Sequence, residues 1–172
     1  MIGTSAGLLV LGLASTALTA SALGQSIASG PISTQATVEI TDTQDKPIAL
    51  KPQEKIAVMF MSAISNLEND CRIHLNRSCP LDELVRGVTS PDWHIGRLKY
   101  DPATDPGYKY TVTTSAQGWQ GHADPQRAGL GGFFYDGSSM MVRFYYNAAG
   151  PAVAQSTNFT GVTIDGDTFR AR

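Results

Sequence analysis

The sequence contains few charged residues and no cluster of basic ones. Of its 172 residues, 16% are charged and the net charge is −2 at pH 7. Lys and Arg are scattered along the chain, so the sequence gives no electrostatic basis for nucleic-acid binding. Because 42% of the residues are hydrophobic, the chain still has enough apolar material for the core of one ordinary domain.

Charge is entirely absent from the first 24 residues, MIGTSAGLLVLGLASTALTASALG. An apolar run followed by small residues is typical of a secretory signal peptide, and Ala20-Ser21-Ala22 fits its cleavage rule. Residues 2–23 are also long enough to remain as a membrane anchor, and a buried core helix is a third interpretation. We assign residues 1–24 to a signal peptide or a membrane anchor. Either of these places the rest of the chain outside the cytoplasm.

Cysteine is scarce as well, and the two that occur, Cys71 and Cys79, are eight positions apart. In an oxidising compartment such a pair most simply forms a disulfide. Together with His74 they also form a metal-like pattern, C-x2-H-x4-C, but this supplies three ligands where structural zinc takes four. Two unpaired thiols are the remaining alternative. We predict a disulfide and no metal site.

From Pro52 onwards an apolar residue recurs every three or four positions, which predicts an amphipathic helix of about five turns. The segment PLDELVRG, from Pro80 to Gly87, has a proline at its start, early acidic residues and a final glycine, and predicts a second, short helix. The disulfide would join the end of the long helix to the start of the short one. The apolar stripe consists of Ile56, Phe60, Ile64, Leu67, Cys71 and Leu75.

The second half of the chain alternates between apolar and polar residues. Residues 108–113 and 119–124 predict one hairpin, and residues 131–147 predict a second one whose turn is Asp136-Gly137. A sheet with one apolar face needs a covering layer. The predicted fold class is therefore α+β, with a long N-terminal amphipathic helix packed on a four-stranded antiparallel sheet.

The predicted elements divide the chain into four parts. Residues 1–24 are the signal peptide or anchor, and residues 25–51 are a tether that contains a short hairpin. Residues 52–152 are the folded head with the helix and the sheet. Residues 153–172 are a tail that adds a small hairpin.

The stretch HADPQRAGLGGFFYDG, from His122 to Gly137, contains residue types that are common in active sites. Its glycines open a strand, whereas a phosphate cradle needs a glycine loop that opens a helix. The stretch itself contains no G-x-S-x-G motif, and Ser138-Ser139 falls in a predicted turn. We interpret the stretch as two strand ends joined by a loop, and predict no catalytic residue and no cofactor.

Three further groups of residues offer alternatives. Asp101, Asp105 and Asp136 lie in loops that would bind calcium if they converged, whereas the simpler interpretation is turn formation. A periplasmic ligand-binding or envelope-assembly module would use exposed aromatic rings. A small secreted hydrolase would need His122 or His94 beside a nucleophile and a carboxylate. The aromatic rings that the ligand-binding or envelope-assembly module would use are Trp93, Trp119, Tyr135 and Tyr145.

Two segments resemble those of a known family. AISNLENDCRIHLNRSCPLDELVRG resembles the pilin segment in which a helix ends and a short L-x-x-L turn follows, and GYKYTVTTSAQGWQGHADPQRAGLGGFFYDG resembles the pilin sheet with its G-Y-x-[YF] strand. The resemblance is to type IV pilins and type II secretion pseudopilins, covers about residues 52–152, and lacks the usual prepilin N-terminus.

This resemblance implies a pilin-like globular head and a non-enzymatic structural or interaction protein. It implies a bacterial protein that is periplasmic, secreted or anchored in the inner membrane. Its expected partners are other protein subunits of the cell envelope or of a filament.

Overall fold

The computed structural model describes residues 37–89, 94–139, 141–165 and 167–170. The predicted leader, residues 1–24, lies outside them, as do residues 25–36 of the predicted tether. Along the described chain, no helix is both long enough and apolar enough to cross a membrane. The elements in chain order are β1 (Val38–Asp42), β2 (Pro47–Ile48), α1 (Pro52–Leu75), α2 (Leu81–Arg86), β3 (Val88–Thr89), β4 (His94–Ile95), the 3-10 helix η1 (Pro102–Thr104), β5 (Tyr108–Ser115), β6 (Gly118–Pro125), β7 (Gly132–Gly137), β8 (Arg143–Asn147), β9 (Thr157–Ile164) and β10 (Asp167–Arg170).

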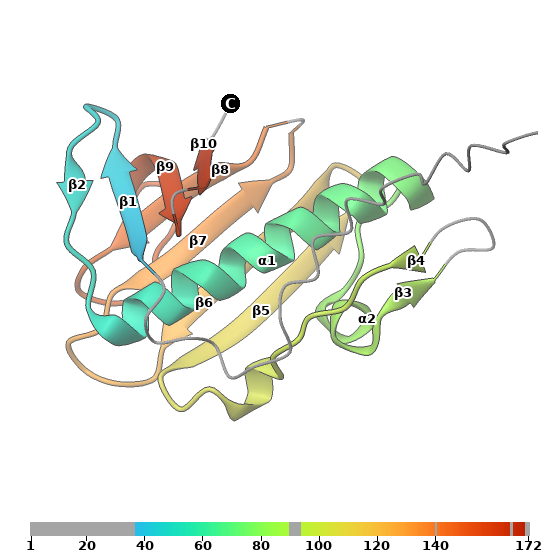
Figure 1. The fold of residues 1–172 in the computed structure, drawn as a ribbon, viewed down its shortest axis with the longest axis horizontal. Coiled ribbons are helices and arrows are strands. Elements are labelled where there is room, and N and C mark those ends of the chain that lie inside the picture. The colour runs from blue at the N-terminus through green and yellow to red at the C-terminus, as the bar shows by residue number, and fades with distance from the viewer. Residues whose placement is uncertain (1–36, 90–93, 140, 166, 171–172) are drawn as a thin grey trace, which may run out of the picture.

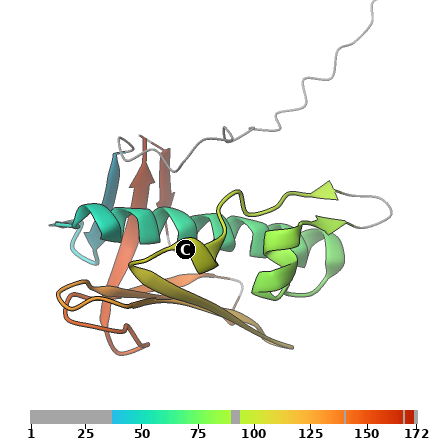
Figure 2. The same cartoon turned by 90° about the horizontal axis from the view of Figure 1, so that it is seen from below.

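Most of the strands form one antiparallel sheet in the order β2-β1-β9-β8-β7-β6-β5, and β10 also pairs with β9. β3 and β4 form a separate small hairpin. Helix α1 lies across one face of the large sheet (Figures 1 and 2). The prediction of a long N-terminal helix on a four-stranded sheet is therefore wrong, because the sheet is much wider and two of its strands, β1 and β2, precede the helix.

The additional strands come from segments assigned to a tether and a tail. β1 and β9 pair from Val38 opposite Ile164 to Asp42 opposite Phe159, although they are far apart in the sequence. In each segment apolar and polar residues alternate over only a few positions. Pairing between distant segments leaves no local signal in the sequence. The pair is nevertheless central, because Ile40 of β1 and the residue opposite it, Val162, are fully buried.

Helix α1 forms where the apolar period predicts it and is 24 residues long. Its buried face is rotated relative to the predicted stripe. Met61 and Glu68 are fully buried, whereas Ile56 and Leu67 are half-buried. The helix contacts β1, β6 and β7 of the sheet as well as β4, so more of its circumference is covered than a narrow apolar stripe requires.

Aromatic side chains of the sheet fill the core beneath α1. Phe133 and Tyr135 on β7 and Phe159 on β9 are completely buried. Phe144 of β8 stacks on Phe159 with ring centroids 5.3 Å apart. Each such ring buries about 150–250 Å², so these aromatic layers supply a large part of the apolar burial that holds the helix to the sheet.

The predicted turn at Asp136-Gly137 is also wrong. β7 continues through Gly137, and Asp136 pairs with Arg143 of β8. A Cβ atom at position 137 would lie 2.3 Å from Nε1 of Trp119. Gly137 therefore allows β7 to approach the Trp119 ring closely. An Asp-Gly dipeptide favours a turn, but here its glycine has a packing role.

Candidate functional site

The strand order of the large sheet ends in β2 on one side and in β5 on the other (Figure 1), while β10 pairs with β9 off this path. β2 has two residues, one of which is Pro47, and it follows a turn that contains Asp45 and Lys46. β5 has eight residues without a proline, and Lys109 is its single charged residue. Short length, proline and charge protect an edge strand from further pairing, so β5 is the unprotected edge.

The main chain of β5 alternates between bonding to β6 and facing outward. At the start of this hairpin Gln126 donates its main-chain N–H to the carbonyl of Gly107 at 2.8 Å. Hydrogen-bonded pairs alternate along an antiparallel ladder. The main-chain groups of Tyr110, Val112 and Thr114 therefore face away from β6, in the direction from which an additional strand would approach.

A shallow groove of about 640 Å³ lies between β5 and α2. The two charged side chains that line it, Asp82 and Arg86, form an ion pair with each other at 2.6 Å. The groove is therefore close to electrically neutral. The apolar and aromatic residues of its wall are Pro80, Leu81 and Val85 on the α2 side and Pro102, Tyr110 and Val112 on the β5 side.

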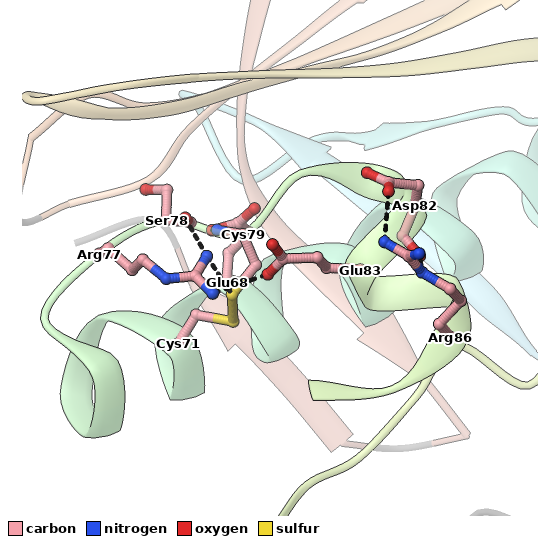
Figure 3. Close-up of polar contacts among 8 residues, drawn as sticks. All are labelled: Glu68, Cys71, Arg77, Ser78, Cys79, Asp82, Glu83 and Arg86. Carbon is pink, nitrogen blue, oxygen red and sulfur yellow. Dashed lines mark hydrogen bonds and ion pairs between the residues drawn. A yellow bond between two sulfur atoms is a disulfide. The ribbon is translucent and has the colours of Figure 1, made fainter. Parts of the chain in front are cut away.

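Helix α2 is joined to α1 by a disulfide between Cys71 and Cys79 (Figure 3), the bond that the cysteine spacing predicts. Both cysteines are completely buried. Cys79 immediately precedes Pro80, the N-cap of α2. The bond therefore fixes the start of the helix that forms one wall of the groove.

Glu68 is buried beside this disulfide, one helical turn before Cys71. Its Oε2 atom accepts a hydrogen bond from the main-chain N–H of Cys79 at 3.1 Å, whereas Oε1 has no hydrogen-bond partner among the described residues. Burial raises the pKa of this carboxyl to about 7, although the Cys79 hydrogen bond and the charges of Arg72 and Arg77 oppose the shift. Glu68 therefore changes its charge near neutral pH.

Arg77 lies in the connection between the two helices and contacts α2 (Figure 3). Its Nη2 atom pairs with Oε2 of Glu83 on α2 at 2.8 Å, and Nη1 donates to the Ser78 carbonyl at 3.1 Å. The Arg77 side chain is 48% exposed, so the ion pair adds little to stability. The guanidinium is engaged with Glu83, and within the described chain no ion pair reaches Glu68.

A second buried carboxylate, Glu54, anchors the other end of α1. It accepts hydrogen bonds from the main-chain N–H groups of Lys51 and Gly131, both at 2.7 Å. The hydroxyl of Tyr108 donates to the Gly131 carbonyl at 2.7 Å. The glycine-rich part of the 122–137 stretch is thus fixed to α1 and β5 by hydrogen bonds, which is a structural role.

The structure does not bring the candidate catalytic residues together. His122 of β6 stacks on Phe134 with ring centroids 4.5 Å apart. Ser138 and Ser139 make hydrogen bonds within their own turn, and none in the described chain links them to His122. The side chain of His94 lies outside the described part of the structure.

The three aspartates considered for calcium binding form local hydrogen bonds instead. Asp101 accepts from the main chain two residues later at 2.9 Å, and Asp136 does the same at 3.1 Å. Asp105 is buried and accepts from the Tyr110 hydroxyl at 2.7 Å. Among the residues that the structure describes, no three His, Cys, Asp or Glu side chains are grouped so that they could hold a metal ion.

The aromatic residues considered for a binding groove are buried. Trp119 is 1% exposed, Tyr135 is fully buried and Tyr145 is 8% exposed, while Trp93 lies outside the described residues. Trp119 borders a hollow of about 320 Å³ at the turn between β5 and β6, which is otherwise lined by Ser, Thr and Gln. The three rings therefore do not form a shared binding surface.

Comparisons with known protein families, with curated proteins and with solved structures give no match to this chain. The interpretation of the site therefore depends on its geometry. Three features define that geometry: the unprotected edge of β5, the apolar groove beside it, and a buried titratable carboxyl at the base of α2.

Proposed function

We propose that this protein is an extracytoplasmic, non-enzymatic structural protein that binds another protein subunit along β5 and in the groove beside it. The disulfide supports the compartment, because such bonds persist mainly in oxidising environments. The observation that carries the binding role is the unprotected edge of β5. An edge strand of this kind is a template for strand addition.

The proposed mode of binding is the addition of one extended segment to the sheet. The segment would bond to the outward main-chain groups of Tyr110, Val112 and Thr114. In an extended chain every second side chain points to the same side. One set of side chains would therefore enter the groove between β5 and α2, while the other set would face solvent.

The chemistry of the groove defines the partner segment. The wall is apolar and its one ion pair, between Asp82 and Arg86, is already satisfied. A charged side chain that entered this groove would lose water without gaining a counter-ion. The proposed partner is thus an extended, uncharged segment with apolar residues at alternate positions.

The resemblance to type IV pilins and type II secretion pseudopilins adds a proposal about the source of this segment. In such assemblies the expected partner is a neighbouring subunit of the envelope or the filament. The segment would then be presented by a protein of the same assembly. This part of the proposal has the resemblance as its support.

A peptide selection tests the proposal directly. A phage-displayed library of random peptides is panned against the immobilised protein, and the enriched peptides are measured against two variants. Thr114→Pro removes an outward-facing N–H and leaves the bonds to β6 intact, whereas Thr114→Ala is the matched control that keeps the N–H. We expect enriched sequences that alternate apolar and polar residues, and that bind the wild type and Thr114→Ala but not Thr114→Pro.

Two results would overturn the proposal. The first is enrichment of peptides that bind Thr114→Pro as well as they bind the wild type, because binding would then not involve the edge. The second is the absence of any enriched peptide. A thermal unfolding curve of Thr114→Pro that matches the wild type excludes misfolding as the reason for lost binding.

A further inference from the structure

The start of α2 is held to α1 at two points, and both involve Cys79. The disulfide joins this residue to Cys71, and its main-chain N–H donates to Glu68 at 3.1 Å. The two residues that follow, Pro80 and Leu81, line the groove beside β5. A change at Cys79 is therefore transmitted directly to the groove wall.

The surroundings of Glu68 suit a neutral carboxyl better than an ionised one. Glu68 is fully buried, and Oε1 has no hydrogen-bond partner in the described chain. The charges that act on it come from three segments: Arg72 on α1, Arg77 in the connection and Glu83 on α2. Arg77 is paired with Glu83. Ionisation strengthens the hydrogen bond from Cys79. A buried charge with that single hydrogen bond and no direct counter-ion is nevertheless a costly state, and a movement that admits water to Oε1 relieves it.

Helix α2 has a separate attachment at Leu84. Leu84 is fully buried, and its carbonyl accepts the main-chain N–H of Leu98 at 2.8 Å. The disulfide prevents the near end from separating from α1. A movement at the junction is therefore limited to a hinge at Cys79 and Pro80 that changes the position of the first turn of α2.

We propose that ionisation of Glu68 loosens the junction between α1 and α2 and displaces the first turn of α2, so that the groove holds its strand more firmly in mildly acidic medium than in alkaline medium. The pKa of about 7 places this change near neutrality. The statement about strand binding rests on the proposed function. The movement of α2 does not, and it can be measured in the protein alone.

The first experiment follows the main-chain amides of the full chain by two-dimensional NMR from about pH 5 to about pH 9. We expect the amide of Cys79 and the amides in the first turn of α2 to shift together with a midpoint near 7. Glu68→Gln, which keeps an acceptor for Cys79 without a charge, should abolish this titration. Glu83→Gln is the comparison variant: it removes a carboxylate that raises the pKa of Glu68 and that pairs with Arg77, so the titration should persist with a lower midpoint.

The second experiment measures the affinity of a peptide selected on this protein at about pH 6 and about pH 8, where we expect roughly five- to tenfold weaker binding at the higher pH. Glu68→Gln should bind the peptide equally at both pH values.

A wild-type protein whose Cys79 and α2 amides do not titrate overturns the inference even if it binds the peptide, and the proposed function then stands alone. If the amides titrate but the peptide binds equally at both pH values, the coupling between Glu68 ionisation and strand binding is overturned. A protein that binds no peptide at any pH overturns the proposed function and the coupling together.

Discussion

The two edges of the sheet differ in length, composition and surroundings. β2 is short, contains Pro47, and follows a turn in which the Asp42 carboxylate accepts the main-chain N–H groups of Gln44 and Lys46 at 2.8 and 2.9 Å. Those hydrogen bonds lower the pKa of Asp42. β5 is long, nearly uncharged and bordered by an apolar groove.

This difference shows that edge protection is local to each strand. Proline and charge make the β2 side unsuitable for strand addition, and nothing comparable occupies β5 after Lys109. The wall beside β5 also belongs to a helix that is held by one disulfide and one buried carboxyl. The β5 side is thus the edge that is open to strand addition and, in our proposal, the edge whose neighbouring wall moves.

Removal of the disulfide should have the largest effect on this contrast. The double substitution Cys71→Ser with Cys79→Ser should lower the free energy of unfolding by about 2–3 kcal/mol, as expected for a loop of this length. Hydrogen exchange should become faster in α2, while the β1–β2 hairpin should be unaffected. The measurement is denaturant unfolding of oxidised samples with exchange detected by mass spectrometry. An unchanged unfolding midpoint would show that the bond does not stabilise the fold.

Neutralisation of Glu68 should have the next largest effect, and it depends on pH. The pKa of Glu68 is raised from 4.5 to about 7 in the folded protein. The wild type therefore bears no penalty below pH 4.5, loses stability as the pH rises through this interval, and carries the full penalty above about pH 7.

Glu68→Gln should accordingly be more stable than the wild type by about 2 kcal/mol at alkaline pH, with the difference disappearing in acid. Unfolding curves recorded across the interval measure this difference. Equal stabilities above neutral pH would contradict the raised pKa. Glu83→Gln should keep this pH dependence and shift it to lower pH, because the Glu83 carboxylate raises the pKa of Glu68 and pairs with Arg77.

Protection of β5 by a charge should have a small effect on stability and a clear effect on binding. Thr114 is exposed, so Thr114→Lys should change the free energy of unfolding by less than about 0.5 kcal/mol. It should nevertheless weaken binding of selected peptides, because lysine on an edge strand opposes pairing. Parallel unfolding and peptide titrations separate the two effects. Undiminished binding would indicate that the peptide does not lie along this edge.

The smallest effect is expected from the reverse change at the other edge. Lys46→Thr combined with Pro47→Thr removes the charge and the proline that protect β2, and should change stability by less than about 0.5 kcal/mol. The variant should begin to self-associate at high concentration, which sedimentation velocity detects. A strictly monomeric variant would mean that the short length of β2 is sufficient protection.

The elements that depend on local signals could be predicted from the sequence. The long helix follows from its apolar period, and the short one from its proline, acidic residues and glycine. The β5–β6 hairpin follows from alternation, and its ends, Ser115 and Gly118, pair as expected. The pairing of β1 with β9 could not be predicted, because its energy comes from contacts between segments that are distant in the sequence.

Of the candidate site, the disulfide is the part that could be predicted from the sequence. The disulfide follows from spacing and compartment. The buried position of Glu68 does not, because it depends on how the chain folds back after α1 and places Cys79 over that face of the helix. A glutamate on a helix face has the same local sequence signal whether solvent or a returning chain covers it. The availability of β5 likewise emerges only from the strand order.

The seam between β1 and β9 has a consequence for the order of folding. The meander from β5 to β8 pairs strands that follow one another along the chain, so it can form early. β1 has to wait for residues 157–164 before it can occupy its place between β2 and β9. Contacts of such large sequence separation slow folding. The sheet is therefore completed only after residues 157–164 have left the ribosome, and until then the side of β1 that faces β9 has no strand to pair with.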